Sequence, residues 1–407
     1  MTRLAPGATA LRAGTVLVAH PSAELYDSDR MLLESVRGLL DSGARVAVAL
    51  PCDGPLSPAL RDLGADVTIC RSPVLRKSAL TPRGFAAFLA ATVGGLADGW
   101  RLITRVRPNR IYVSTLTVPL WIALAKVRRI GVLCHVHEGE ASASAAVRAA
   151  IAAPLLFADE VVANSRFSVG VLAGSFPSLG RRASVIYNGV PGPDSRQQAR
   201  QALDTPLRIA YVGRLSPRKG VDVAVEALSI LHRRGVPARL DLMGTVFTGY
   251  EWYEKELRDE VRLLALEPWV RFHGFVPSVW QHVESSDVVV VPSRADEPFG
   301  NTAVEAILCG RPVIASATSG LLEATAGYRA SRTVPAGDAE ALADCLIEMA
   351  SNWHYMRSAA WKDVALAEER HSPATYRRRV VDAVLSLRPR AWAADRSQER
   401  VLAGGRP

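Results

Sequence analysis

Two glutamates separated by seven residues stand where a loop gives way to a helix. The stretch EPFGNTAVEAILCGRPVIAS, residues 297–316, holds Glu297 before an apolar helical pattern and Glu305 one turn inside it. Gly310 and Pro312 end this pattern, and a β-branched run follows, so we predict loop, helix, turn and strand. A carboxylate has two acceptor oxygens and could bind sugar or ribose hydroxyls. The alternative is structural, with an ordinary helical Glu305 and a Glu297 that stabilises the helix dipole.

The start of this predicted helix could bind the same ligand through its backbone. The first amides of a helix have no partner within the helix, and its N-terminus favours negative charge such as that on a leaving phosphate. The candidate residues at this helix start are Phe299, Gly300, Asn301 and Thr302.

A basic loop in the second half is a further candidate site. It lies in YVGRLSPRKGVD, residues 211–222, where Gly213 allows a tight strand exit and Gly220 precedes a helix. Arg214 and Lys219 place two cations beside a helix N-terminus, a combination that can neutralise a diphosphate. The alternative is a solvated basic loop without a ligand.

Two histidines share one side of an expected strand in the sequence HVHE. His135 and His137 alternate with an apolar residue, so they point the same way. With Glu138 or Glu140 they could hold a metal ion, and a structural histidine is the other interpretation. The sequence DSD at residues 27–29 precedes a helical pattern, so we interpret Asp27 or Ser28 as an N-cap, with Asp29 favouring the helix dipole.

The elements that must position these residues alternate along the chain. Apolar strands followed by helical patterns indicate parallel sheets covered on both faces. We expect strands at residues 14–20, 45–50, 66–70, 110–114, 131–138 and 160–165, and again at 207–213, 239–244, 269–276, 287–293, 312–316 and about 333–334. The fold class is therefore α/β, with two Rossmann-like doubly wound domains, and a ligand should lie in the cleft that faces the carboxyl ends of the strands.

The domain boundaries follow from turn-rich stretches between the two series of strands. We predict a loose N-terminus at 1–13, an N-terminal domain at 14–190, a linker at 191–206, a C-terminal domain at 207–371, a helix at 372–388 that packs back toward the N-terminal domain, and a loose tail at 389–407.

Charge is spread unevenly over the 407 residues. Residues 1–200 hold 23 Lys and Arg against 14 Asp and Glu, so they carry the whole net charge of +9. A basic half favours an anionic partner such as lipid head groups, nucleic acid or a phosphorylated acceptor, although it could merely serve solubility. The five cysteines stand singly, which suggests free thiols. Without a signal peptide or a spanning segment in the sequence, we expect a cytoplasmic protein.

One segment of the basic half could touch a membrane. Residues 75–108 are apolar on one side, carry Arg and Lys at both ends and include Trp100. Such a segment could lie on an anionic surface, with support from Trp121 and the basic residues 126–129. The alternative is an ordinary helix pair that packs on the core and is broken at Gly94-Gly95.

Several motifs resemble a known family. The stretch EPFGNTAVE matches the Glu-x7-Glu signature of the retaining glycosyltransferases of family 4, and GRLSPRKG is similar to that family's cationic diphosphate loop. The motifs VVANS, VIYNGV and GRPVIAS stand where the family has them. The likeness covers most of residues 14–388 and is strongest from 185 to 325. It implies the GT-B fold, with the nucleotide-sugar donor in the second domain and the acceptor in the first.

The resemblance also implies a role for each matching residue. Glu297 would contact the donor sugar and Glu305 the ribose. Arg214 and Lys219 would bind the diphosphate in place of a metal, because family members need neither a metal nor another cofactor. His137 falls where the family has a histidine that touches the donor sugar at the reaction zone. The nucleotide base would lie near His273, Phe275 and Val276.

The chain departs from the family pattern in the first domain. Many members have a loop with two glycines ahead of an acidic-Arg pair, where this chain has the sequence YDSDR at residues 26–30. This loop would then shape the acceptor pocket instead of approaching the donor phosphate.

The resulting hypothesis is a cytoplasmic retaining hexosyltransferase that could also bind peripherally to the inner face of the membrane. Its donor would be of UDP or GDP type and its acceptor a glycan or lipid-linked precursor, and we expect no nucleic acid partner. The rivals are a sugar-nucleotide epimerase of the same fold, a metal hydrolase built on His135, His137 and Glu138, and a non-catalytic sensor of sugar nucleotides.

Overall fold

The chain folds into two compact units. The computed structural model describes residues 14–25, 27–75, 82–139, 141, 143–203 and 206–392. Unit 1 contains the chain up to Gly189 together with the segment from Pro373 onward, and unit 2 is Val190–Ser372. The expected loose N-terminus at 1–13 and most of the expected tail, from residue 393, lie outside the described residues.

Unit 1 is built on a sheet of seven parallel strands in the order β3-β2-β1-β4-β5-β6-β7. The strands are β1 (Thr15–Ala19), β2 (Arg45–Leu50), β3 (Asp66–Ile69), β4 (Arg110–Ser114), β5 (Gly131–Val136), β6 (Glu160–Ala163) and β7 (Ala183–Val185). The central strands β1 and β4 are buried along their whole length, as apolar runs in a doubly covered sheet require.

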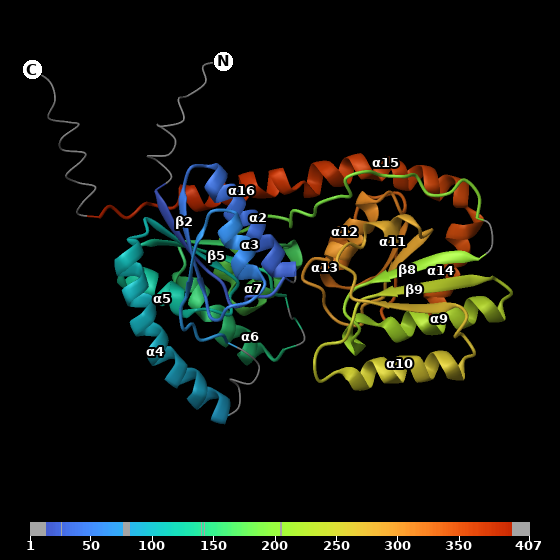
Figure 1. Ribbon diagram of the computed structural model, residues 1–407, viewed down its shortest axis with the longest axis horizontal. Coiled ribbons are helices and arrows are strands. Elements are labelled where there is room, and N and C mark those ends of the chain that lie inside the picture. The colour runs from blue at the N-terminus through green and yellow to red at the C-terminus, as the bar shows by residue number, and fades with distance from the viewer. Residues whose placement is uncertain are drawn as a thin grey trace, which may run out of the picture. The chain divides into compact units, whose positions relative to one another are not determined.

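Helices cover both faces of this sheet (Figure 1). One core lies under α2 (Asp27–Asp41), α3 (Leu56–Asp62) and α16 (Pro373–Ser386). The other lies under α4 (Pro82–Val106), α5 (Leu120–Val127), α6 (Ala145–Ala152), α7 (Arg166–Ser175) and α8 (Pro177–Arg182), with the 3-10 turn η2 (Ala153–Phe157). Helix α16 packs against α2, so the chain returns to unit 1 after it has formed unit 2.

Unit 2 repeats the plan with six parallel strands in the order β10-β9-β8-β11-β12-β13. These are β8 (Leu207–Val212), β9 (Ala238–Met243), β10 (Val270–Gly274), β11 (Val288–Val291), β12 (Val313–Ser316) and β13 (Ser331–Val334). Its helices are α9 (Val221–Arg233), α10 (Glu251–Leu263), α11 (Trp280–Glu284), α12 (Asn301–Leu308), α13 (Ser319–Thr325), α14 (Ala339–Ser351) and α15 (Trp353–His371), preceded by the 3-10 turn η3 (Pro217–Lys219). The predicted fold class of two Rossmann-like units with parallel sheets is thus confirmed.

The segment expected to be a linker is anchored on unit 2. Arg200 donates two 2.7 Å hydrogen bonds to the buried carboxylate of Asp287, and Ala199 is buried in the core. Arg196 donates to the carbonyl of Leu308. The sequence predicted an unattached linker because this stretch is polar and turn-rich. Its arginines bind acceptors that are distant in the chain, and a local pattern does not show such contacts.

The first residues of the expected tail also have partners. Trp392 donates its indole N–H to the carbonyl of Pro108, and the amide of Arg390 donates to Asn109. These bonds extend the packing of α16 on unit 1.

The predicted break at Gly94-Gly95 is wrong. Residues 82–106 form the single helix α4, and the glycines serve close packing instead. A Cβ on Gly95 would lie 2.9 Å from the carbonyl oxygen of Arg71 and equally close to Leu120 and Pro73. Glycine costs about 1 kcal/mol in a helix, and here the close approach of a loop and of α5 offsets this cost.

Candidate active site

The sheet of unit 2 changes winding direction between β8 and β11, which are neighbours in the sheet but far apart in sequence. Loops that follow two such strands separate at the carboxyl edge and leave room for a ligand. The loop after β8 carries Lys219, and the loop after β11 carries Glu297. The two principal candidate segments therefore meet at the switch point.

Lys219 and Glu297 form an ion pair at this point. The Lys219 Nζ atom lies 2.8 Å from Oε1 and 2.9 Å from Oε2 of Glu297. The hydroxyl of Ser293 donates to Oε1 over 2.9 Å. Glu297 is only 6% exposed, so its charge depends on these partners, while a quarter of the Lys219 side chain (24%) remains in contact with solvent. The carboxylate engages at most two of the three ammonium donors, so Lys219 can also donate to a ligand.

The backbone around the pair holds both side chains in place. The Ser319 hydroxyl contacts the Glu297 amide at 2.7 Å and the Glu297 carbonyl at 3.0 Å, and the amide of Gly320 donates to the same carbonyl. On the other side, Gly220 has a left-handed φ of 65°, and a Cβ there would lie 2.0 Å from the carbonyl oxygen of Pro292. Only glycine fits this close contact between the two loops.

Arg218 adds a second cation that the sequence analysis did not single out. Its Nη2 lies 3.9 Å from Oε1 of Glu297 and donates to the carbonyl of Asp296. About half of its side chain is exposed. Lys219 and Arg218 thus surround one carboxylate with two positive charges.

Arg214, the other cation predicted for a diphosphate, lies over an aromatic ring. Its guanidinium carbon is 3.1 Å from the ring centroid of Phe247, a cation–π contact that fixes the plane of the guanidinium. The Tyr211 hydroxyl donates to the Arg214 carbonyl over 2.8 Å. Gly213 and Gly244 approach so closely that a Cβ on Gly244 would lie 1.8 Å from the Gly213 carbonyl oxygen. The ends of β8 and β9 therefore set the position of Arg214.

The residues predicted to face a nucleotide base lie at the end of β10. His273 shares a 2.7 Å hydrogen bond between Nε2 and Oδ1 of Asp241, and its ring lies 4.6 Å from that of His282. Phe275 is exposed and Val276 half-buried in the loop that follows. An exposed ring beside an oriented imidazole is a surface on which a base can stack.

The first turn of α12 begins without a side-chain cap. Gly300 precedes it with a φ of 109°, and Asn301 and Thr302 are half-buried in the first turn. The ring of Phe299 is buried and packs 5.5 Å from that of His371, so this residue offers a ligand its backbone only. Glu305 follows one turn further along α12 and is half-buried.

The two candidate histidines of unit 1 lie at the end of β5, with His135 inside the strand and His137 directly after it. The ring centroids of His135 and His137 lie 4.2 Å apart, as expected for side chains on one side of a strand. His135 is fully buried and bonds the hydroxyl of Tyr112 through Nδ1 over 2.9 Å. Burial, and then the neighbouring His20, lower the pKa of His137 to about 3. At neutral pH His137 is therefore an uncharged hydrogen-bonding group.

The sequence DSD at residues 27–29 begins α2, and its last residue has a buried partner. Asp29 is buried, and its Oδ1 lies 2.7 Å from Nε2 of His20. The other ring nitrogen of His20 contacts the hydroxyl of Ser114 at 3.2 Å. Asp29 lies in the first turn of α2 and pairs with His20, which follows β1, and its predicted effect on the helix dipole stays a prediction.

No group of three or more His, Cys, Asp or Glu is placed to hold a metal ion within the described part of the chain. Glu140, one of the ligands considered for a metal site, lies outside it. Among the described residues, His135, His137 and Glu138 are therefore not part of such a group.

Comparison with known proteins identifies the family. Residues 206–352 match the family model described as "Glycosyl transferases group 1", and residues 28–191 match the model described as "Glycosyltransferase Family 4". The two matches together span most of both units. The chain belongs to glycosyltransferase family 4. The Lys219–Glu297 pair and the start of α12 lie inside the first match, and His137 lies inside the second.

The sequence is also similar to that of a curated protein. D-inositol 3-phosphate glycosyltransferase of Saccharomonospora viridis is 31% identical over 255 residues, which are 59% of this chain and 57% of the relative. The chain thus spans little more than half the length of this curated relative.

Solved structures of other proteins share the fold. Anabaena HepE, crystallised in complex with UDP-glucose, superposes with a TM-score of 0.76 at 22% identity and covers 92% of this chain and 100% of its own. Sucrose-phosphate synthase of Thermosynechococcus elongatus gives a TM-score of 0.72 at 18% identity, over 91% and 98% of the two chains. The fold of this family 4 member is GT-B, as the sequence motifs predict.

The sequence did not predict several residues that position the side chains of the site. Ser293 and Ser319 hold Glu297, Asp241 orients His273, and Phe247 orients Arg214. Of these, only Asp241 leaves a signal in the sequence, as a carboxylate inside an apolar strand. Among the described residues, no helix combines the length and apolar character needed to cross a membrane.

Proposed function

We propose that this chain is a retaining glycosyltransferase that moves a hexose from a nucleoside diphosphate sugar to an acceptor bound by unit 1. The observation that carries the proposal is the Lys219–Glu297 pair at the switch point of the unit 2 sheet. A ligand there meets a cationic loop, a helix start and a buried carboxylate at once. The crystallised complex of Anabaena HepE with UDP-glucose supports a donor of UDP type.

In the proposed mechanism, positive side chains of unit 2 stabilise the leaving diphosphate. Lys219 and Arg214 bind its oxygens, and the dipole of α12 favours the charge that develops there. Glu297 accepts hydrogen bonds from the donor sugar and Glu305 from the ribose. These cations perform the role that a divalent ion has in other enzymes, so the reaction needs no metal or other cofactor.

Neutral His137 contributes a hydrogen bond at the reaction zone. Its lowered pKa of about 3 keeps the imidazole uncharged, so it can contact a sugar hydroxyl without repelling an electron-poor anomeric carbon. The acceptor hydroxyl attacks from the face that the diphosphate leaves, and a phosphate oxygen takes its proton. The product then keeps the anomeric configuration of the donor.

A panel of UDP- and GDP-sugars tests this function. A donor at one hundred times its Kd adds about 2.7 kcal/mol to stability, which a thermal shift detects easily. The stabilising donor is then incubated with a pool of lipid-linked and soluble glycan acceptors, and NMR assigns the anomer formed. Retention supports the proposal. An inverted product, a donor isomerised without acceptor, or tight donor binding without any product would contradict it.

A membrane-bound acceptor is supported by one surface of unit 1. The helix α4 presents Leu89, Val93, Leu96 and Trp100 to solvent at spacings of four, three and four, so they form one stripe. We name these four residues the α4 stripe. Arg101, three-quarters exposed, follows it on the same helix, and Arg128 lies 4.3 Å over the ring of Trp100. An apolar stripe with flanking arginines suits the surface of an anionic bilayer.

The α4 stripe, and not Trp121, would make this contact. Trp121 is 1% exposed and donates its indole N–H to Ser72, so its predicted contribution to a membrane surface is wrong. A cytoplasmic protein would then dock on the inner leaflet through α4.

Vesicle sedimentation tests the docking. Val93, the most exposed residue of the α4 stripe, is changed to Asp, and Ala90→Asp, exposed on the same helix outside the stripe, is the matched control. We expect binding to vesicles with anionic lipid to fall at least tenfold for Val93→Asp and much less for Ala90→Asp. Equal losses in the two variants would mean that only charge matters and that the stripe does not insert.

A further inference from the structure

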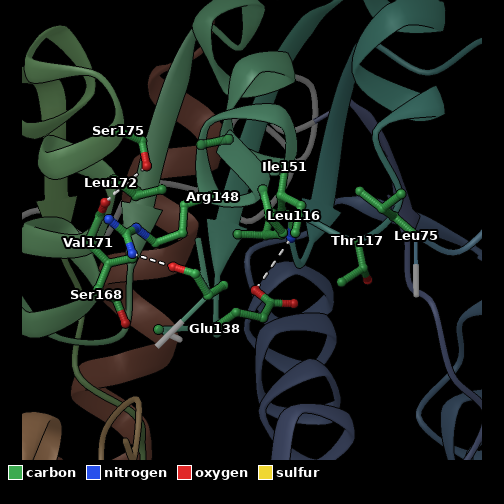
Figure 2. Close-up of a pocket in the computed structure, with 14 residues that line it drawn as sticks. Leu75, Leu116, Thr117, Glu138, Arg148, Ile151, Ser168, Val171, Leu172 and Ser175 are labelled. Carbon is green, nitrogen blue, oxygen red and sulfur yellow. Dashed lines mark hydrogen bonds between the residues drawn. The ribbon is translucent and has the colours of Figure 1, made fainter. Parts of the chain in front are cut away.

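A cavity of about 420 Å³ lies in unit 1, outside the donor residues of unit 2. It opens between the loop after β4, the loop after β5 and the helices α6 and α7 (Figure 2). This volume lies within the range of small-molecule sites in proteins. No residue of the cavity was singled out by the sequence analysis except Glu138.

The wall of the cavity is mainly aliphatic. Its larger aliphatic side chains are those of Leu75, Leu116, Val147, Ile151, Val171 and Leu172. They come from segments that are far apart in sequence, and Figure 2 shows those labelled there gathered around one space. Such a lining favours a ligand that leaves water for an apolar environment.

Most polar groups in the wall already have partners inside the protein. The Ser175 hydroxyl donates to the carbonyl of Val171, and the Ser168 hydroxyl donates to Asn164. The guanidinium of Arg148 donates through Nη1 to the carbonyls of Ala141 and Ala143. A sugar ring placed here would lose hydrogen bonds to water from several hydroxyls with few acceptors in return, at a cost of 1–3 kcal/mol or more for each.

One carboxyl group stands at the edge of this apolar space. Glu138 accepts from the amide of His137 at 3.0 Å and from that of Leu116 at 3.5 Å. Figure 2 shows the second bond beside the cavity. Burial outweighs these bonds and raises the pKa of Glu138 to about 7. The carboxyl group can therefore exchange a hydrogen bond with a single hydroxyl of a ligand.

The backbone beneath Glu138 is strained. Thr115, the residue after β4, has a φ of 109°, a region that β-branched residues rarely adopt. It is buried, and its hydroxyl lies 2.6 Å from that of Thr117, which lines the cavity. Strain of this kind persists where the surrounding structure enforces it, commonly at binding sites.

We propose that this cavity binds the apolar portion of the acceptor, an isoprenoid or aromatic group, with one hydroxyl directed to Glu138. The inference rests on the proposed glycosyltransferase function and deepens it by naming the chemistry of the acceptor. It accounts for a cavity with a mainly aliphatic wall, whose serine hydroxyls and Arg148 already donate to protein acceptors and whose carboxyl group is that of Glu138.

Calorimetric titration of the full chain with three probes tests the proposal without any donor present. Geraniol stands for an isoprenoid source, 4-phenylphenol for an aromatic source and methyl α-glucoside for a sugar. The variant Val147→Phe narrows the cavity, and Ala146→Phe, the neighbouring exposed residue of α6, is its matched control. Val171→Phe repeats the test from α7 if Val147→Phe does not fold, as judged by circular dichroism.

We expect geraniol or 4-phenylphenol to bind wild type and Ala146→Phe with a negative heat-capacity change, and to bind Val147→Phe at least tenfold more weakly. Binding of geraniol would indicate an isoprenoid group on the acceptor, and binding of 4-phenylphenol an aromatic group. The free alcohol should bind several-fold better than its methyl ether, and Glu138→Gln should reduce this preference. Methyl α-glucoside binding that Val147→Phe removes would overturn the proposal, as would equal affinities of every probe for the two α6 variants.

Failure of this inference is separable from failure of the proposed function. Titration of the wild-type chain with UDP reports on the donor site of unit 2 alone. UDP binding without probe binding would reject the cavity as an acceptor site and leave the glycosyltransferase proposal intact. Probe binding without any nucleotide-sugar binding would reject the function and leave an apolar binding site.

Discussion

Lys219 is expected to stabilise the fold and the reaction through different partners, and the two contributions can be separated. Its ammonium group contacts both oxygens of Glu297, which is 6% exposed. In the proposed reaction, the same charge also binds the leaving diphosphate. The informative variants are Lys219→Met, Glu297→Gln and the double variant, because Met and Gln keep much of the side-chain shape while removing the charges.

The stability effect follows from the geometry of the pair. Removing one partner of a fully buried ion pair costs about 3–5 kcal/mol. A quarter of Lys219 remains exposed and Ser293 still donates to the carboxylate, so we expect a loss of about 2 kcal/mol for Lys219→Met. The double variant removes both charges of the pair and leaves only the half-exposed Arg218 nearby, so it should recover most of this loss, with a coupling energy of about 1–2 kcal/mol.

The catalytic effect should not recover. One lost electrostatic contact to a leaving group slows an enzyme by about 10²–10³-fold, and Glu297→Gln cannot replace the missing cation. The double variant should therefore be as slow as Lys219→Met or slower. Stability is measured by urea unfolding, and turnover by release of UDP from the stabilising donor.

Lys255→Met is the matched control. Lys255 is 78% exposed and pairs with Asp259 in α10 at 2.9 Å, so its loss should change stability by less than about 1 kcal/mol and turnover hardly at all. A double variant that regains both stability and turnover would refute the reasoning, since Lys219 would then act only by neutralising Glu297.

The remaining predictions concern a carboxyl group and a loop. Burial raises the pKa of Glu138 from 4.5 to about 7, so its contribution to stability is present below about pH 4.5 and lost as pH rises toward 7. In the wild type, this group should lower the free energy of unfolding by on the order of 2 kcal/mol between pH 5 and 8. Glu138→Gln should remove this decrease when unfolding by urea is measured across that range. An unchanged pH dependence would contradict the raised pKa of Glu138. Gly220→Ala should abolish UDP binding, because its Cβ would lie 2.0 Å from the Pro292 carbonyl oxygen. Gly235 has a similar φ of 74° but lies in open space. Gly235→Ala should therefore lower the free energy of unfolding by only about 1–2 kcal/mol and leave UDP binding intact. Calorimetry with UDP compares the two, and equal losses would show that backbone strain alone matters.

The strands and the family were predictable because their signals are local. Apolar β-branched runs such as those of β11 and β12 need only neighbouring residues to be recognised, and the Glu-x7-Glu motif lies within a single loop and helix. The strand β7 was not predicted, since three residues are too few to show a pattern. The continuous helix at Gly94-Gly95 was missed because the partners that offset the cost of glycine come from another part of the chain.

The contacts of the site depend on strand order, which the sequence does not state. Lys219 and Glu297 are 78 residues apart and meet because β8 pairs with β11. Asp29 reaches His20, nine residues earlier, because α2 begins beside the end of β1, and the sequence pattern alone does not show this buried pair. The unit 1 cavity arises from segments between Leu75 and Ser175, and no single motif marks it.

A crystal structure of the protein with UDP tests the central claim, that side-chain cations of unit 2 hold the diphosphate of the donor. The account predicts density for the diphosphate within hydrogen-bonding distance of Lys219 and Arg214, and for the ribose hydroxyls beside Glu305. Nucleotide density bound at another place, or a diphosphate held by a metal ion and not by these side chains, would contradict it.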